Sequence, residues 1–242
     1  MPLLDVIQAV CQRTNVPIPS SVLGTTDPLW TQMLHLLEEE GHDLSERGEW
    51  QALTNEATFV TLAAESQGAM TSIATNGFRS VKLDPHNNTI WDRTNRLPVL
   101  GPLSADEWQT RKALLSSGPR YVWRIRGGLL IINPAPLAGA ILAFEYLSKN
   151  WILGADGTTY KQYFTLDTDT ILLPEELVIM GLRWRWKKEK GLEYAEDFNT
   201  YQEQVKDALG RDGGKRTLSM DNEGRDRSAR PGIFVPQYNF PL

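Results

Sequence analysis

The sequence predicts an α+β protein in which helices from both chain ends form one bundle, and a strand-rich domain is inserted between them in the sequence. Apolar residues recur at helical spacing near both ends, and their spacing changes to two in the middle of the chain. A polar segment with an aromatic, proline-containing end closes the sequence. We expect a helical domain from residues 1–54 and 171–210, a β-rich insertion with one helix over 55–170, and an extended C-terminal arm over 211–242.

Two helices are expected before the insertion. Apolar residues lie at helical spacing within Leu3–Cys11, and a second apolar face extends over Leu29–Leu44. Asp27 and Pro28 precede this second face as a helix N-cap and first helical residue. Both segments therefore supply an amphipathic helix to one bundle.

Local motifs predict a helix and a hairpin inside the insertion. Ser104 is followed three residues later by Glu107, which is the spacing of a capping box at a helix start. Gly127 and Gly128 separate two apolar runs and can supply the positive φ angles of a tight hairpin turn.

Helical periodicity returns at Pro174, which Glu175 and Glu176 follow as suitable residues for the positive end of a helix dipole. The last expected helix has a narrow apolar stripe with intervals of four, three, four and four residues. The stripe consists of Tyr194, Phe198, Tyr201, Val205 and Leu209.

Charge and composition limit the function classes. The chain has 25 Lys and Arg against 30 Asp and Glu, a net charge of -5, which argues against a protein that wraps nucleic acid by neutralising phosphates. Its one cysteine, Cys11, excludes a disulfide framework and a thiolate metal cluster. No stretch reaches the roughly 18 apolar residues of a membrane span, so we expect a soluble protein made in a reducing cytoplasm.

No catalytic, metal-binding or cofactor-binding residue is predicted. His35 and His42 share an expected helix with Glu38 and Glu39, but their spacing fits a solvated helix face better than a metal site, and His86 has no evident partner. Four carboxylate pairs could serve a glycosidase, yet each also has a local structural explanation. They are Asp106 with Glu107, Asp167 with Asp169, Glu175 with Glu176, and Glu193 with Asp197.

A basic and aromatic cluster extends over Arg183–Lys188. Residues two apart on a helix point roughly 200° apart, so Trp184 and Trp186 cannot face the same side, and we expect Trp186 to emerge among the basic residues. A subunit interface, packing against the β block and single-stranded nucleic-acid binding all fit this cluster. The candidate interface residues are Arg183, Trp186 and Lys187.

The segment after Leu209 is polar and glycine-rich, and it ends in the sequence IFVPQYNFPL. Such a composition cannot build a core, whereas its apolar end can dock on a partner. Folding back onto its own domain is the alternative. The candidate contact residues of this arm are Ile233, Phe234, Val235, Tyr238 and Phe240.

Two long segments, WDRTNRLPVLGPLSADEWQTRKA and FTLDTDTILLPEELVIMGLRWRWKKEKGLEYAEDFNTYQEQV, resemble the head-to-tail adaptor proteins of tailed phages. The resemblance extends from about Leu29 to Leu218 and is most specific over Phe164–Val205. The family has no catalytic signature, so the resemblance implies a structural role and no enzymatic activity.

The resemblance implies a virion protein of the neck or tail connector, assembled in the host cytoplasm into a ring, usually of twelve copies. Its partners would be the portal, neighbouring copies and a downstream tail or nozzle protein. The ring would extend and seal the DNA exit channel and take part in tail assembly and DNA ejection, with dsDNA passing without specific binding. The alternatives are a tail-associated cell-wall hydrolase and a nucleic-acid-binding module.

Overall fold

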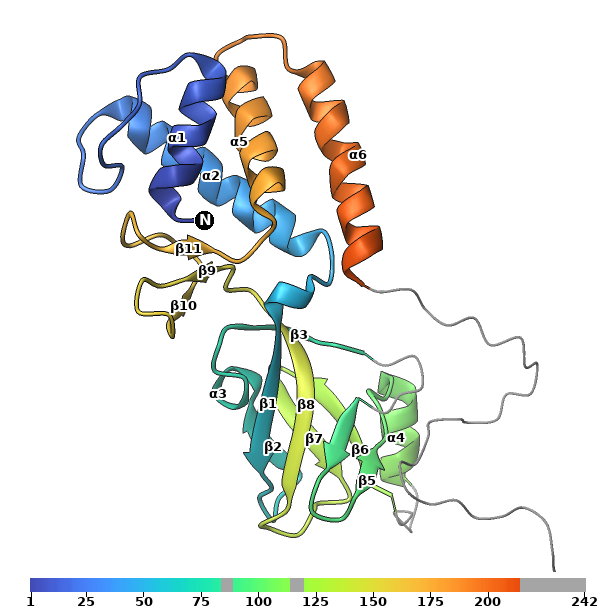
Figure 1. The fold of residues 1–242 in the computed structure, drawn as a ribbon. Helices are drawn as coiled ribbons and strands as arrows, with labels where there is room; N and C mark the ends of the chain where they lie inside the picture. The colour runs from blue at the N-terminus through green and yellow to red at the C-terminus, as the bar shows by residue number, and fades with distance from the viewer. Residues whose placement is uncertain (84–88, 114–119, 214–242) are drawn as a thin grey trace, which may run out of the picture.

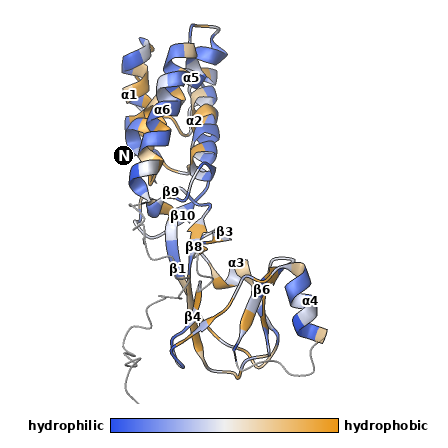
Figure 2. Cartoon of the chain, turned by 90° about the vertical axis from the view of Figure 1, so that its right-hand side faces the viewer, coloured by the Kyte–Doolittle hydropathy of each residue, from blue (hydrophilic) through white to orange (hydrophobic). Residues whose placement is uncertain are grey.

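The computed structural model describes residues 1–83, 89–113 and 120–213. It confirms the α+β class, with helices and antiparallel sheets in the same chain. A helical unit and a β unit lie one above the other in two perpendicular views (Figures 1 and 2). The described part contains no helix long and apolar enough to cross a membrane.

Four helices make the helical unit, and the third of them along the chain contacts the other three (Figure 1). The first two come from the start of the chain and the last two from its end, so distant segments share one core. They are α1 (Leu3–Thr14), α2 (Pro28–Glu46), α5 (Glu175–Glu189) and α6 (Ala195–Asp212). Because α5 packs against α1, α2 and α6, it has little surface left for solvent.

The expected start of α2 is confirmed. Asp27 accepts a hydrogen bond from the Leu29 N–H at 2.9 Å, and Pro28 occupies the first turn. The cap satisfies one of the backbone donors that a helix start leaves unpaired.

A small sheet of three short strands lies under the helices. Its strand order is β10 (Tyr160–Lys161), β9 (Ile152–Leu153) and β11 (Thr170–Ile171). Trp151, Ile152, Phe164 and Ile171 belong to the hydrophobic core of the helices. This stretch was assigned to the β-rich insertion by its sequence, yet it packs with the bundle.

The β unit consists of two antiparallel sheets around a second core. The larger sheet has the order β1 (Thr54–Val60), β8 (Ile141–Ser148), β4 (Ile90–Asp92) and β5 (Leu97–Val99), and β3 (Phe78–Val81) also pairs with β8. The smaller sheet has the order β2 (Ser66–Ala69), β7 (Leu129–Asn133) and β6 (Val122–Arg126). Two helices complete the unit, α3 (Met70–Ile73) and α4 (Ala105–Ala113).

Both local motifs of the insertion are confirmed. Gly127 and Gly128 have φ angles of 57° and 74° between β6 and β7, as a type I′ hairpin turn requires. The Ser104 N–H donates to Glu107 Oε2 at 2.8 Å, and the Glu107 N–H donates to Ser104 Oγ at 3.3 Å. This capping box begins α4, whose Trp108 is buried.

An arginine of the β unit joins it to the helical unit. Arg79 of β3 donates to the backbone carbonyls of Ser45 and Gly48, at the C-terminal end of α2. The Gln51 N–H, just before β1, donates to Asp212 of α6 at 2.7 Å. Arg79 therefore ties the β unit to the end of α2, and the Gln51–Asp212 bond ties the connection from α2 to β1 to the end of α6.

Candidate interaction surfaces and the clusters that support them

A buried ionic cluster joins three helices of the bundle. Arg185 of α5 donates through Nε to Glu40 of α2 at 2.7 Å, and the Tyr201 hydroxyl of α6 donates to the same carboxylate. Glu40 and Tyr201 are fully buried, and Arg185 is 6% exposed. Burial raises the pKa of the Glu40 carboxyl, and the hydrogen bonds from Arg185 and Tyr201 oppose that rise.

Two further carboxylates hold the guanidinium from the surface side. Arg185 pairs with Glu39 and Asp43, which follow one another by about one turn of α2 and are more than half exposed. All three carboxylates of this cluster lie on α2, so one arginine fixes the position of α5 along α2.

Two glycines allow the close contacts around this cluster. A Cβ atom on Gly181 of α5 would lie 2.1 Å from Glu40 Cδ, and one on Gly41 of α2 would lie 2.2 Å from the Trp151 ring. Neither position has room for a side chain. The helices therefore approach at Gly181, and the small sheet contacts α2 at Gly41.

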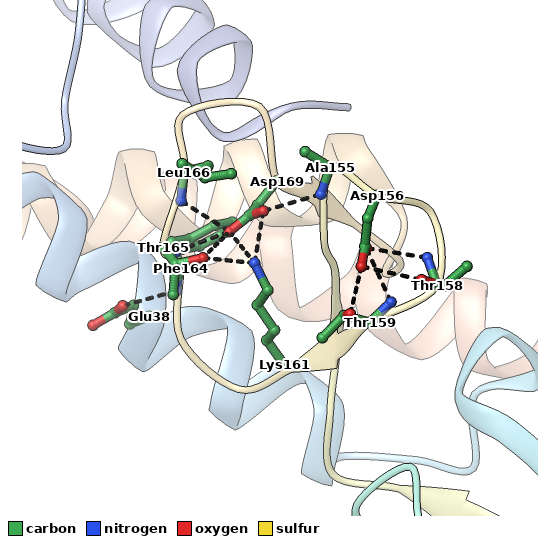
Figure 3. A network of polar contacts seen from close by, with 10 residues as sticks. All are labelled: Glu38, Ala155, Asp156, Thr158, Thr159, Lys161, Phe164, Thr165, Leu166 and Asp169. Atoms are coloured by element: carbon green, nitrogen blue, oxygen red, sulfur yellow. Dashed lines mark hydrogen bonds and ion pairs between the residues drawn. The ribbon is translucent and has the colours of Figure 1, made fainter.

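A second polar cluster fixes the loop between β10 and β11 (Figure 3). The buried Asp169 accepts hydrogen bonds from the N–H groups of Ala155, Thr165 and Leu166 at 2.8–3.2 Å. Its oxygens also lie 3.0 and 3.2 Å from Lys161 Nζ. Burial alone would raise the pKa of this carboxyl, but the donors outweigh burial and lower the pKa to about 2.

Asp167 ties the same loop to the α1–α2 connection. It accepts hydrogen bonds from the Ser21 hydroxyl and from the N–H groups of Val22 and Leu23. Asp167 and Asp169 therefore act as separate structural anchors, and each has its own set of donors.

Each of the other three pairs has at least one member with a structural partner. Glu107 completes its capping box, Glu175 pairs with the N-terminal ammonium at 2.5 Å, and Glu176 pairs with Arg13 at 3.4 Å. The Asp197 carboxylate forms ion pairs with Arg183 and Lys187. None of these contacts singles out a pair as an acid and base.

The two described histidines, His35 and His42, have different surroundings and do not form a metal site together. His35 is largely exposed beside Glu38, whereas the ring of His42 lies edge-on to Trp151 and Tyr163 at 6.2 and 5.5 Å between centroids. Half-burial of His42 against two aromatic rings differs from the solvated face expected for it. His86 lies outside the described residues.

The expectation that Trp186 emerges on the surface is wrong. Its side chain is 3% exposed and belongs to the helical core, and Lys190 Nζ lies 4.4 Å from its ring centroid. Trp184, on another side of α5, is also buried, at 7%. The two tryptophans do face different directions, but α5 has neighbours on both sides.

The basic residues of this helix have partners within the chain. Arg183 and Lys187, one turn apart, both pair with Asp197 of α6, and about a third of each side chain is exposed. Arg185 belongs to the buried cluster, and Lys188 lies 5.9 Å from the Trp184 ring centroid. This use of the cations in ion pairs and ring contacts disfavours a nucleic-acid groove here.

The five arm residues, Ile233, Phe234, Val235, Tyr238 and Phe240, lie outside the described part of the chain. Sequence reasoning missed Glu40 and its cluster. The available signals were an arginine in an apolar helix and glycines inside two helices, but the pairing itself depends on the packing of α2 against α5.

A family model, described as SU10 adaptor protein, matches residues 1–232. The chain belongs to the SU10 adaptor family. This is a phage head–tail adaptor family, which agrees with the resemblance of the sequence. An SU10 adaptor is a structural component of the phage neck that docks with portal and tail proteins. No curated protein matches this chain.

Proposed function

We propose that this adaptor forms a ring between the portal and the tail and that the ring extends and seals the DNA exit channel. The observation that carries the proposal is the family match, which includes nearly the whole chain. Twelve copies is the proposed ring size. Heterologous contacts, in which one face of a subunit meets a different face of its neighbour, generate such a ring.

The two units give the proposed ring subunit its parts. The cores support a division in which residues 1–53 and 149–212 build the helical unit and residues 54–148 build the β unit. The C-terminal arm then begins just after α6. We propose these boundaries in place of the sequence-based division at residue 170, because Trp151 and Ile171 pack in the core of the helical unit.

The proposed ring contact of the helical unit includes Arg183 and Lys187. Both are partly exposed at the α5–α6 face and are held in place by Asp197. The buried Trp186 supports this face from within the core. The portal contact is assigned to Ile233, Phe234, Val235, Tyr238 and Phe240 of the arm.

The proposed channel lets dsDNA pass without specific binding. The chain carries a net charge of -5, and ion pairs with Asp197, Glu39, Glu40 and Asp43 occupy several of its cations. A dense set of free cations would add affinity for each phosphate and slow the movement of DNA. Assembly in the host cytoplasm and contact with a downstream tail or nozzle protein complete the proposal.

Copy number in purified virions tests the ring. Quantitative mass spectrometry of the virion, with the portal as internal reference, should give about as many copies of this chain as of the portal. One or two copies per virion would contradict the proposal.

Deletion of residues 233–242 tests the arm. The truncated chain should unfold at the same temperature as the full chain and bind the portal more weakly. A full-length Phe234→Ala/Phe240→Ala variant provides a milder test, and it should also lose portal affinity. A truncated chain that no longer folds would show that the arm belongs to the core.

A further inference from the structure

Arg124 and Arg126 of β6 lie on the face of the small sheet that α4 partly covers. In β6, Trp123 and Ile125 pack into the core of the β unit, so the alternating residues Val122, Arg124 and Arg126 share the opposite face. Register places Arg124 opposite Ile131 and Arg126 opposite Leu129 of β7.

α4 covers only one end of this face. Trp108 packs with Val122 and Ile131, and Lys112 pairs with Glu65, which immediately precedes β2. The half-buried Arg124 lies opposite Ile131 at the edge of that cluster, and the exposed Arg126 and the 43% exposed Leu129 lie beyond it at the hairpin end.

The cations on this face are not neutralised within the described chain. Neither Arg124 nor Arg126 has a side-chain hydrogen bond or ion pair to a described residue, and the same holds for Arg111, one turn after Trp108 in α4. By contrast, Arg183 and Arg185 of α5 are paired with carboxylates. We call Arg124 and Arg126, together with Arg111 of the helix that packs on this sheet, the basic face.

A matching acidic stripe lies on α6. Glu196, Glu203 and Asp207 are exposed, and at 100° per residue they fall within about 40° of one another. They lie opposite the buried Tyr201 and Val205. No described cation forms an ion pair with any of the three. We call them the acidic stripe.

The two surfaces have similar spacing between their charged residues, and their charges are opposite. Glu203 and Asp207 are separated by about 6 Å along the helix, and Arg124 and Arg126 by about 6.6 Å along the strand. The helical unit, residues 1–53 and 149–212, has 11 Lys and Arg against 20 Asp and Glu, whereas residues 54–148 have 9 against 7. The helical unit is acidic and the β unit slightly basic.

We infer that the basic face of one copy docks on the acidic stripe of a neighbouring copy. Within one chain the two surfaces lie in different units, α6 above and α4 with β6 below, so a second copy must bring them together (Figure 1). The contact is heterologous, as a ring requires, and rests on the proposed function. Three arginines supply few phosphate contacts, and the adjacent exposed Leu129 suits a protein surface better than DNA.

Charge exchange tests this contact in the full-length protein. Arg124→Glu/Arg126→Glu and Glu203→Arg/Asp207→Arg should each weaken assembly on the portal about tenfold, and the chain carrying all four changes should regain it. Arg96→Glu/Lys149→Glu reverses two exposed cations elsewhere and should assemble like the parent. Thermal unfolding verifies that each variant folds, and native mass spectrometry counts the bound copies.

The outcomes separate the inference from the proposed function. If the parent assembles and both exchanged variants do so equally well, the inference is wrong and the ring proposal stands. A reduced affinity for dsDNA with unchanged assembly in Arg124→Glu/Arg126→Glu would also overturn it, because the face would then bind nucleic acid. A parent chain that never binds an assembled portal would contradict the proposed function itself.

Discussion

The Arg185 guanidinium donates to Glu40 at 2.7 Å in a site where the glutamate is fully buried and the arginine nearly so. The pair connects the first and second halves of the helical unit across 145 residues of sequence. Loss of one partner leaves an uncompensated charge in the core, which costs more than the loss of an exposed pair.

Replacement of Arg185 by Met should therefore lower the free energy of unfolding by about 3–5 kcal/mol. Glu39→Gln, which removes an exposed partner of the same arginine, should change it by no more than about 1 kcal/mol. Urea denaturation of the two variants measures both values. Equal effects would show that burial of Glu40 does not determine the cost.

Gly181→Ala should destabilise the bundle by about 1–3 kcal/mol, because the new methyl group meets the Glu40 side chain. Gly210→Ala in α6 is the matched control, since a Cβ there meets nothing within 4 Å. Alanine should stabilise that helix by about 0.5–1 kcal/mol. Opposite signs in thermal or urea unfolding support the close approach of α2 and α5 at Gly181.

Asp169→Asn should remove part of the acid sensitivity of the fold. The Asp169 pKa is lowered to about 2, so its contribution of about 2 kcal/mol is present above the unfolded pKa near 4 and is lost as the pH falls through 2. The stability difference between parent and variant should therefore shrink between pH 4 and pH 2. A difference that stays constant over this range would contradict the donor set around Asp169.

Trp186→Ala should cost about 3–5 kcal/mol of stability, because the ring is in the core. An exposed interface tryptophan would instead leave unfolding of the monomer within about 0.5 kcal/mol of the parent and change only assembly. Chemical denaturation at a concentration where the chain is monomeric separates the two cases.

Local motifs were predictable because their geometry depends on a few neighbouring residues. The Ser104–Glu107 capping box, the Asp27 cap and the Gly127–Gly128 turn were all expected from spacing and residue type, and the structure has them. The α+β class followed from the change in apolar spacing along the chain.

Tertiary neighbours decided what sequence reasoning missed. Trp186 was expected at the surface because periodicity predicts one buried face for an outer helix, whereas α5 is surrounded by three helices. Trp151 follows a strand in sequence but inserts against Gly41 of α2. The partners of Arg185 also could not be predicted, because Glu40 becomes its neighbour only after the helices pack.

Native mass spectrometry of this chain with the cognate portal ring tests the adaptor proposal most directly. The full-length protein, alone and mixed with assembled portal, is measured in the same buffer. We predict a discrete complex with about one copy of this chain per portal subunit. An assembled portal that binds no copies would contradict the proposal.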